Sequence, residues 1–163
     1  MQPEELTRQY LEQAKVMQLA TSTNDQPWAC TVHYYSDSEL NLYWISTTER
    51  QHSQQIAQNP KVAAAILVHL NTPEERYVIG ISLEGTAELI GQHIDELIGQ
   101  GYIQKLGREP ALLTDIASGK NPHKFYRLKP SKIVLFDSKN FPDNLRQEVV
   151  IPTGTMGDTF DRQ

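Results

Sequence analysis

Residues 40–60, LNLYWISTTERQHSQQIAQNP, decide the fold class. The first part, residues 40–46, alternates Leu40, Leu42 and Trp44 with other side chains, which predicts a strand whose second face is also partly covered. The second part is polar and predicts a helix over residues 47–59. That helix must end at Asn59-Pro60, because the residue before a proline disfavours helical geometry. The stretch therefore predicts a strand followed directly by a single short helix.

The sequence on both sides of this stretch predicts antiparallel strands. Short apolar segments separated by turn residues predict strands at 16–22, 28–35, 61–70, 76–90, 124–128 and 132–136, and helices at 4–15, 93–106 and 110–118. Gly80 and Gly85 are expected where the long strand 76–90 bends or bulges. Antiparallel strands with one inserted helix predict a mainly β, α+β fold built as a closed or split barrel.

Length and composition narrow the function classes. The chain has 163 residues, which predicts a single domain over residues 1–152 and a disordered tail over 153–163. The net charge of −5 argues against a nucleic-acid binder, which usually carries a basic stripe. The longest apolar run of the chain, residues 62–68, is far shorter than the ~18 residues of a membrane span. A single cysteine and no apolar N-terminal run predict a cytoplasmic protein.

Several common catalytic signatures do not occur. The sequence has no GxGxxG or GxSxG motif, and its five histidines include no pair three or four residues apart. We therefore expect no metal site, and a hydrolase triad would have no signature. Cys30 is predicted to be a small buried side chain rather than a nucleophile, since no basic residue lies beside it in the sequence.

One segment can hold an anion, at the predicted strand-to-helix junction. Thr48 and Gln51 fit a capping box, which would start the helix near Glu49. The start of a helix presents free backbone N–H groups and the positive end of its dipole, and Arg50 can add a fork of donors. The same residues also fit an ordinary helix start with Arg50 in solvent and Glu49 opposing any anion.

Further polar side chains surround this junction. Ser46 and Thr47 offer hydroxyl groups, and His52 follows two residues after Arg50. Aromatic residues on the adjoining strands are either the wall of a ligand pocket or part of the core: Trp28, Tyr34, Tyr35, Tyr43 and Trp44.

Several segments, in order, resemble the FMN-binding split-barrel superfamily related to pyridoxamine 5′-phosphate oxidase. No single segment is diagnostic, but their order and spacing from about Glu4 to Asp137 are similar to those of small, uncharacterised bacterial members. The segments are LATS at 19–22 with Pro27, the strand 28–35, LYWIS at 42–46, IAQNPKV at 56–62, ISLEGTAEL at 81–89, FYRLKP at 125–130 and the strand 132–136.

The resemblance implies a six-stranded antiparallel split β-barrel that forms a homodimer and binds FMN in clefts at the subunit interface. By the same resemblance, Ser46, Thr47, Arg50 and His52 would hold the flavin phosphate. The strand from Ala29 to Tyr34 would approach the flavin ring, largely through backbone groups. The expected ring-side residues are Ala29, Thr31, His33 and Tyr34.

The chain departs from the superfamily pattern in two places. Gln51 and His52 stand where an arginine-lysine pair usually precedes the Asn-Pro, so two fixed positive charges are missing. The arginine and histidine motif that binds substrate in pyridoxamine phosphate oxidases does not occur in residues 140–152. Oxidation of pyridoxine phosphate is therefore not the expected activity.

The resemblance implies a flavin-dependent oxidoreductase or flavin reductase, in which FMN N5 accepts hydride from a reduced nicotinamide and passes it to a small substrate. His33 or Tyr34 is the candidate for a side-chain base, although both fit a structural role. A deazaflavin or haem is an alternative cofactor, and haem would need His33, His52 or His123 as a ligand. A non-catalytic dimeric binding or sensing protein is the alternative from another class.

Overall fold

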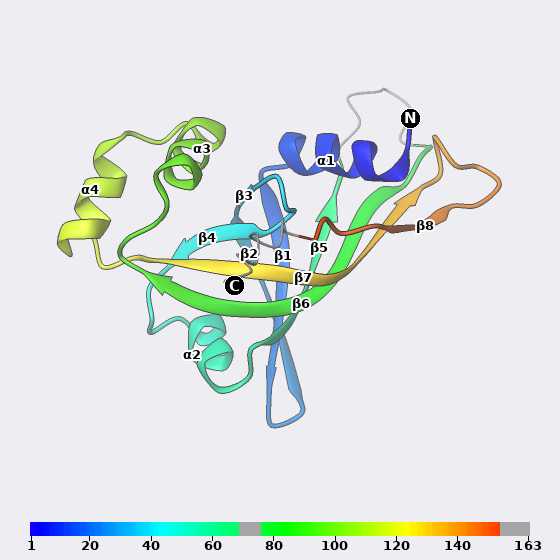
Figure 1. Cartoon of the computed structure of the whole chain (residues 1–163). Coiled ribbons are helices and arrows are strands. Elements are labelled where there is room, and N and C mark those ends of the chain that lie inside the picture. The colour runs from blue at the N-terminus through cyan, green and yellow to red at the C-terminus, as the bar shows by residue number, and fades with distance from the viewer. Residues whose placement is uncertain (69–75, 154–163) are drawn as a thin grey trace, which may run out of the picture.

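The computed structural model describes residues 1–68 and 76–153 as four helices and eight strands (Figure 1). The helices are α1 (Pro3–Gln13), α2 (Gln51–Gln58), α3 (Glu96–Leu106) and α4 (Ala111–Ser118). The strands are β1 (Val16–Thr23), β2 (Gln26–His33), β3 (Tyr35–Ser36), β4 (Leu42–Ser46), β5 (Lys61–Leu67), β6 (Ile79–Gly91), β7 (Lys124–Asp137) and β8 (Arg146–Val149).

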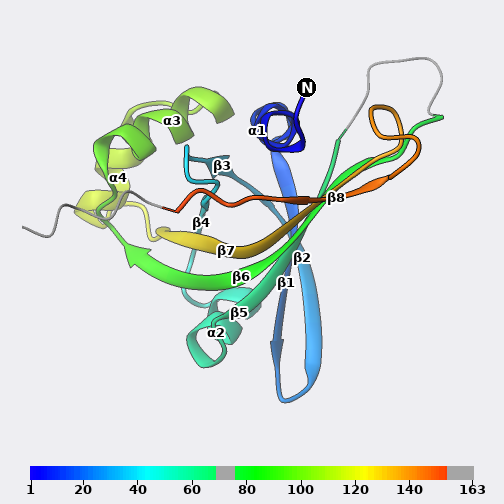
Figure 2. The same ribbon diagram turned by 45° about the vertical axis from the view of Figure 1, so that its right-hand side comes forward.

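The strands form one antiparallel sheet in the order β2-β1-β5-β6-β7-β4-β3, with β8 paired to β7. Figures 1 and 2 show β6 and β7 as long curved strands, with α1 and α2 on opposite sides of the sheet. This arrangement confirms the predicted α+β split barrel. The resemblance implies six strands, and the additional ones are β3 and β8. The predicted strand 28–35 divides into the end of β2 and the start of the two-residue β3, whereas the short β8 was not predicted from the sequence.

The main core fills the curve of the sheet beneath α1. Alternate residues of β5 and β6 point into it, as expected for strands with one covered face. Fully buried side chains from α1, β1, β4 and β7 meet there, and removing this apolar surface from water is the principal stabilising contribution. The members with no exposed surface include Leu11, Met17, Leu19, Trp44 and Leu128.

A β-bulge bends the long strand pair at Gly85. The pairing of β6 with β7 shifts between Glu84 and Gly85, because Glu84 pairs with Lys132 whereas Gly85 pairs with Pro130. A bulge leaves the ladder locally open, so it accommodates a proline that has no N–H to donate. The predicted break between residues 128 and 132 is therefore wrong, since β7 continues through Pro130. The bulge expected at Gly85 is confirmed, whereas Gly80 pairs regularly with Phe136.

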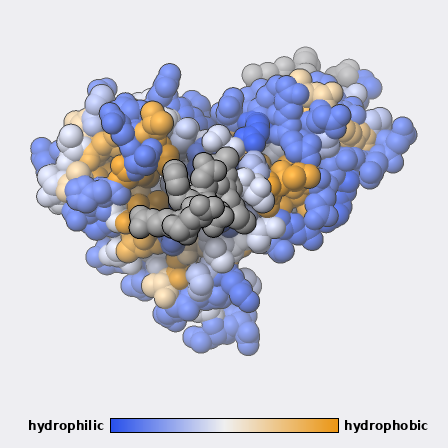
Figure 3. All heavy atoms as spheres, in the orientation of Figure 1, coloured by the Kyte–Doolittle hydropathy of each residue, from blue (hydrophilic) through white to orange (hydrophobic). Residues whose placement is uncertain are grey.

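A second, smaller core supports the α3–α4 pair. Tyr102, Ile116 and Phe125 are buried together, and partly buried side chains of β3, β4 and the two helices pack around them. The rings of Tyr102 and Phe125 meet edge to face with centroids 5.8 Å apart. Figure 3 shows apolar surface over this part of the molecule.

None of the helices within residues 1–68 and 76–153 is long and apolar enough to cross a membrane. Two expectations extend beyond these residues: the last two positions of the strand 61–70, and the tail from residue 154 onward.

Candidate functional site

A cleft of about 540 Å³ opens where β2, the end of β4, the start of α2, the end of α3 and the start of β7 come together. Five of the predicted site residues line it: Thr31, His33, Ser46, Arg50 and His52. The strand-to-helix junction and the β2 strand therefore face one shared space, although the sequence separates them by a turn and another strand.

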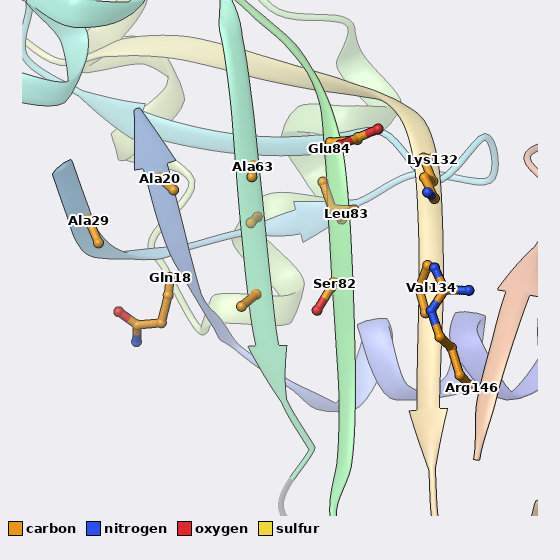
Figure 4. A pocket seen from close by; sticks show the side chains of 12 residues that line it. Gln18, Ala20, Ala29, Ala63, Ser82, Leu83, Glu84, Lys132, Val134 and Arg146 are labelled. Carbon is orange, nitrogen blue, oxygen red and sulfur yellow. The ribbon is translucent and has the colours of Figure 1, made fainter. Parts of the chain in front are cut away.

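The other three predicted site residues lie elsewhere. Ala29 lines a different hollow on the open face of the sheet (Figure 4). Tyr34 has no exposed surface, and its hydroxyl donates a hydrogen bond of 2.8 Å to the carbonyl of Leu11 at the end of α1. Thr47 follows Ser46 but is not among the lining residues, and its carbonyl accepts from the backbone N–H of Arg50 at 3.4 Å.

A hydrogen bond joins the two ends of the strand-to-helix junction. The Oγ of Ser46, the last residue of β4, lies 2.9 Å from Nε2 of His52 in the first turn of α2. Both side chains are buried. Burial, and then the nearby Arg50 charge, lower the pKa of His52 below its usual 6.5, so the imidazole is mainly neutral at pH 7.

The α2 helix begins without a side-chain cap. Arg50 is its N-cap residue and has extended backbone geometry, so the predicted capping box of Thr48 and Gln51 and the predicted start near Glu49 are wrong. Its first intrahelical bond runs from Gln54 N–H to the Arg50 carbonyl. The backbone N–H groups of residues 51–53 therefore have no partner within the helix. Gln51 and His52 belong to the cleft lining, so this positive helix end opens on the cleft.

Of the two roles left open for the aromatic residues, the core is correct for most of them. Tyr34, Tyr43 and Trp44 are buried, and Trp44 stacks on Tyr126 with ring centroids 5.5 Å apart. Of the five predicted aromatic residues, only Trp28 lines the cleft, with 44% of its surface exposed.

Cys30 also lines the cleft, and it is half-buried rather than fully buried. Burial raises the pKa of its thiol above the ordinary value of 9.0, so the thiol stays protonated at neutral pH. This agrees with the expectation that Cys30 is not a nucleophile.

Three residues of the cleft were missed by sequence reasoning: Tyr102, Arg108 and His123. Tyr102 belongs to α3, Arg108 follows that helix, and His123 precedes β7. The Nδ1 of His123 lies 2.7 Å from Oδ1 of Asn121. An amide oxygen only accepts hydrogen bonds, so Nδ1 carries the proton and Nε2 is left for another partner.

The charged and titratable side chains of the cleft include no carboxylate. Arg50 and Arg108 contribute two fixed positive charges, and His33, His52 and His123 contribute three imidazoles. In the part of the chain that the structure describes, neither arginine side chain forms a hydrogen bond or an ion pair. No cluster of three or more potential metal ligands occurs among these residues. In a chain with a net charge of −5, the cleft is thus a local basic site.

The sequence profile named pyridoxamine 5′-phosphate oxidase matches residues 3–136, which is most of the chain. The chain belongs to the pyridoxamine 5′-phosphate oxidase family. The match includes the β4–α2 junction with Ser46, Arg50 and His52, and it includes Arg108 and His123.

Solved structures share this fold at low sequence identity. A conserved hypothetical protein from Mycobacterium tuberculosis superposes with a TM-score of 0.68 and 15% identity over 98% of this chain and 94% of that one. A haem storage protein from Vibrio cholerae superposes with a TM-score of 0.61 and 17% identity, over 82% of this chain and 94% of that one. An FAD-binding protein from Mesorhizobium loti superposes with a TM-score of 0.55 and 22% identity, over 82% of this chain and 92% of that one. No curated protein sequence matches the chain.

Proposed function

We propose that this member of the pyridoxamine 5′-phosphate oxidase family is an FMN-binding oxidoreductase or flavin reductase. The observation that supports this most directly is the uncapped start of α2, which opens with Arg50 on a cleft whose lining contains no carboxylate. Backbone N–H groups at a helix start, together with a guanidinium group, form a favourable site for a phosphate.

The residues present fit the flavin phosphate. Arg50 offers a fork of N–H donors and the first turn of α2 its free N–H groups, while the Ser46 hydroxyl lies beside them in its hydrogen bond with His52. His52 is mainly neutral, so it contributes a hydrogen bond rather than a charge. Arg50 is then the fixed charge on this side of the cleft, in place of the basic pair that Gln51 and His52 replace.

The β2 strand would face the flavin ring. It lies at the edge of the sheet, so the backbone groups on its outer side are not taken up by a neighbouring strand. The Thr31 hydroxyl already donates to Gln18 at 2.8 Å, which leaves backbone groups and the exposed His33 as the available partners. When bound, the flavin supplies electron and hydride transfer, and the protein supplies position and polarity.

The proposal includes a homodimer, formed through the open face of the sheet. Figure 4 shows small side chains there on neighbouring strands, around a hollow of about 520 Å³. Glu84 lines the same hollow as Lys132 and Arg146, which permits reciprocal ion pairs across a two-fold axis. Ala29 of β2 lies on this face while Thr31 and His33 line the cleft, so a second copy seated here would border the cofactor.

The dimer is tested by the mass in solution. We expect twice the chain mass of 18.5 kDa by light scattering, and a monomer for Ala65→Arg, which places a charge on the paired face. Asn144→Arg adds the same charge on the exposed turn before β8 and is expected to stay dimeric. A wild-type mass of 18.5 kDa would exclude the dimer.

Haem is the second candidate cofactor, and His123 favours it. An imidazole that binds iron through Nε2 usually donates its Nδ1 proton to a neighbouring oxygen, and His123 has this arrangement with Asn121. His52 is less suitable, because its Nε2 is already bonded to Ser46. One structural relative is named as a haem storage protein.

Titration of the purified protein with FMN and with haem distinguishes the two candidate cofactors. We expect the purified protein to bind FMN, with about a tenfold loss in affinity for Arg50→Gln, because a charge-assisted hydrogen bond to phosphate is removed. Lys139→Gln removes a charge from the exposed turn after β7 and is the matched control. A protein that takes up no FMN contradicts the proposal, and a Soret band lost in His123→Gln supports haem. FMN binding without reduction by NADH or NADPH would indicate a non-catalytic binding or sensing protein.

A further inference from the structure

We infer that a pocket beneath α2 is a second binding site, separate from the cleft, for a small uncharged molecule with an apolar body and one hydroxyl or carbonyl group. The pocket has a volume of about 410 Å³ and lies between α2, the last part of β6 and the first part of β7. Figures 1 and 2 both show α2 beside β6. None of the residues that line the pocket also lines the cleft, so a molecule bound here would not displace a cofactor.

The floor of the pocket is apolar. Ile56, Ala87 and Tyr126 line it, and each has at most 5% of its surface exposed. The Tyr126 ring is held by stacking on Trp44, with ring centroids 5.5 Å apart. Leu89 also lines the pocket and is 52% exposed, so it extends the apolar surface toward solvent. A fixed aromatic ring beside aliphatic side chains suits the apolar body of a small molecule.

One polar group of the pocket lacks a partner. Ser53 lines the pocket and is only 4% exposed, and its hydroxyl forms no hydrogen bond among the described residues. A buried hydroxyl without a partner costs free energy, because it has lost its bonds to water and has not replaced them. A serine hydroxyl can donate and accept, so a carbonyl or a hydroxyl group of a ligand would satisfy it.

The charges around the pocket disfavour an ionic ligand. The one carboxylate in its lining is Glu88, and Arg127 already forms an ion pair with it. Among the described residues, no lysine, arginine or histidine lines the pocket, so an anion would meet a carboxylate without a compensating positive charge. The pocket is thus the reverse of the cleft, which contains two arginines and no carboxylate.

Hydrogen bonds to β1 hold α2 in place over the pocket. The Thr21 hydroxyl donates to the side-chain oxygen of Gln55, and the Asn59 side-chain amide donates 3.1 Å to the Ser22 carbonyl. Neither Gln55 nor Asn59 lines the pocket. The helix is therefore fastened through residues that a ligand would not touch, and a preformed pocket loses little binding free energy to reorganisation.

Three probes of similar shape test the inference: acetophenone, 1-phenylethanol and ethylbenzene. They carry a carbonyl, a hydroxyl and no polar group, respectively. Each is titrated into the purified protein without added cofactor, with the NMR signals of the alanine methyl groups as the readout. We expect the two polar probes to shift Ala57 and Ala87 of the pocket, but not Ala63 and Ala65 on the open face of the sheet. Ethylbenzene should bind about five- to tenfold more weakly, because it offers Ser53 no partner.

Two variants and a control locate the binding. Ser53→Ala should weaken acetophenone binding about five- to tenfold, to the level of ethylbenzene, whose own affinity should stay unchanged. Ala57→Phe fills the pocket from an exposed position of α2 and should abolish the binding of all three probes. Ala111→Phe adds the same ring at an exposed position of α4 and should bind the probes like wild type.

The inference is overturned if no probe binds, or if ethylbenzene binds as tightly as acetophenone. An acetophenone affinity that is unchanged in Ser53→Ala or in Ala57→Phe would also overturn it, as would equal shifts at Ala57 and Ala63. No FMN is present in these titrations, so their outcome is independent of the proposed cofactor.

Discussion

The Nε2 atom of His52 lies 2.9 Å from the hydroxyl oxygen of Ser46, across the turn that joins β4 to α2. Both side chains are buried, so this hydrogen bond is protected from competition with water. It fixes the first turn of α2 against the end of the strand, and Arg50 lies between the two bonded residues. The orientation of the proposed phosphate site therefore depends on one side-chain contact rather than on a helix cap.

Ser46→Ala should lower the free energy of unfolding by about 1–2 kcal/mol, because it leaves the buried His52 nitrogen without a partner. Urea unfolding measures this loss. Ser53→Ala, one residue after His52 in α2, is the matched control, since the buried Ser53 hydroxyl has no hydrogen-bond partner among the described residues. We expect that control to be neutral or slightly stabilising. Equal losses in both variants would show that the Ser46–His52 bond contributes nothing specific.

Stability should fall as the pH drops below about 6.5, and His52 should account for part of the fall. Burial, and then Arg50, lower the pKa of His52 in the folded state, so between the unfolded value of 6.5 and that lower value the unfolded chain binds more protons. The His52 contribution is thus complete above pH 6.5 and is lost below it. Urea unfolding at pH 7.5 and 5.0 should give a smaller difference for His52→Gln than for wild type. An unchanged difference would mean that His52 is not buried as a neutral ring.

Lys105 should make stability increase with pH between 8 and about 10. Its Nζ donates 2.8 Å to the Leu11 carbonyl and lies 3.8 Å from the centre of the Tyr34 ring. Burial nevertheless lowers its pKa from 10.5 to about 8, so in this range the unfolded chain binds the extra proton. Lys105→Met should remove that part of the slope. Comparison at pH 8.0 and 9.5 avoids the tyrosines, whose raised pKa values act in the opposite sense at higher pH. Parallel slopes for the two proteins would contradict the burial of Lys105.

Gly85→Ala should destabilise the protein by at least about 2 kcal/mol, because the new Cβ atom would overlap the backbone of Lys129 and Pro130 at the bulge. Gly80→Ala lies in the same strand, where the nearest atom to a Cβ is the Ile66 carbonyl oxygen at an ordinary 3.5 Å. Its effect should stay within about 1 kcal/mol. Thermal or urea unfolding compares the two variants directly. Similar losses in the free energy of unfolding would contradict the close contact between Gly85 and the backbone of Lys129 and Pro130.

The fold could be predicted where a local pattern was strong. Residues 40–60 combine an alternating strand with a polar helix and an Asn-Pro stop, and β4 and α2 lie within them. The local sequence pattern gave a wrong prediction at two points. Pro130 looked like a strand break, but the bulge opposite Gly85 removes the need for its N–H. Thr48 and Gln51 have capping-box spacing, yet the chain turns through residues 47–50 and begins the helix one residue after Arg50.

Of the residues that line the cleft, the sequence could group only those that lie close together along the chain. Ser46, Arg50 and His52 stand within seven residues of one another, so their proximity is visible in the sequence. Arg108 and His123 reach the cleft only because α3 and α4 fold back over their own small core, and no spacing in the sequence encodes that path. Tyr34 lies outside the cleft for a related reason: it follows the end of β2, where its side chain turns inward and its hydroxyl donates to the carbonyl of Leu11.

The small core under the α3–α4 pair joins these helices to the edge of the sheet. Tyr102 and Ile116 come from the helices, but Phe125 comes from β7, and Lys105 of α3 donates to the carbonyl of Leu11 in the main core, so the helical pair and the sheet are packed as one structure. A change in this small core would therefore reach both the residues that the helices contribute to the cleft, Tyr102 and Arg108, and the strands that contribute the rest.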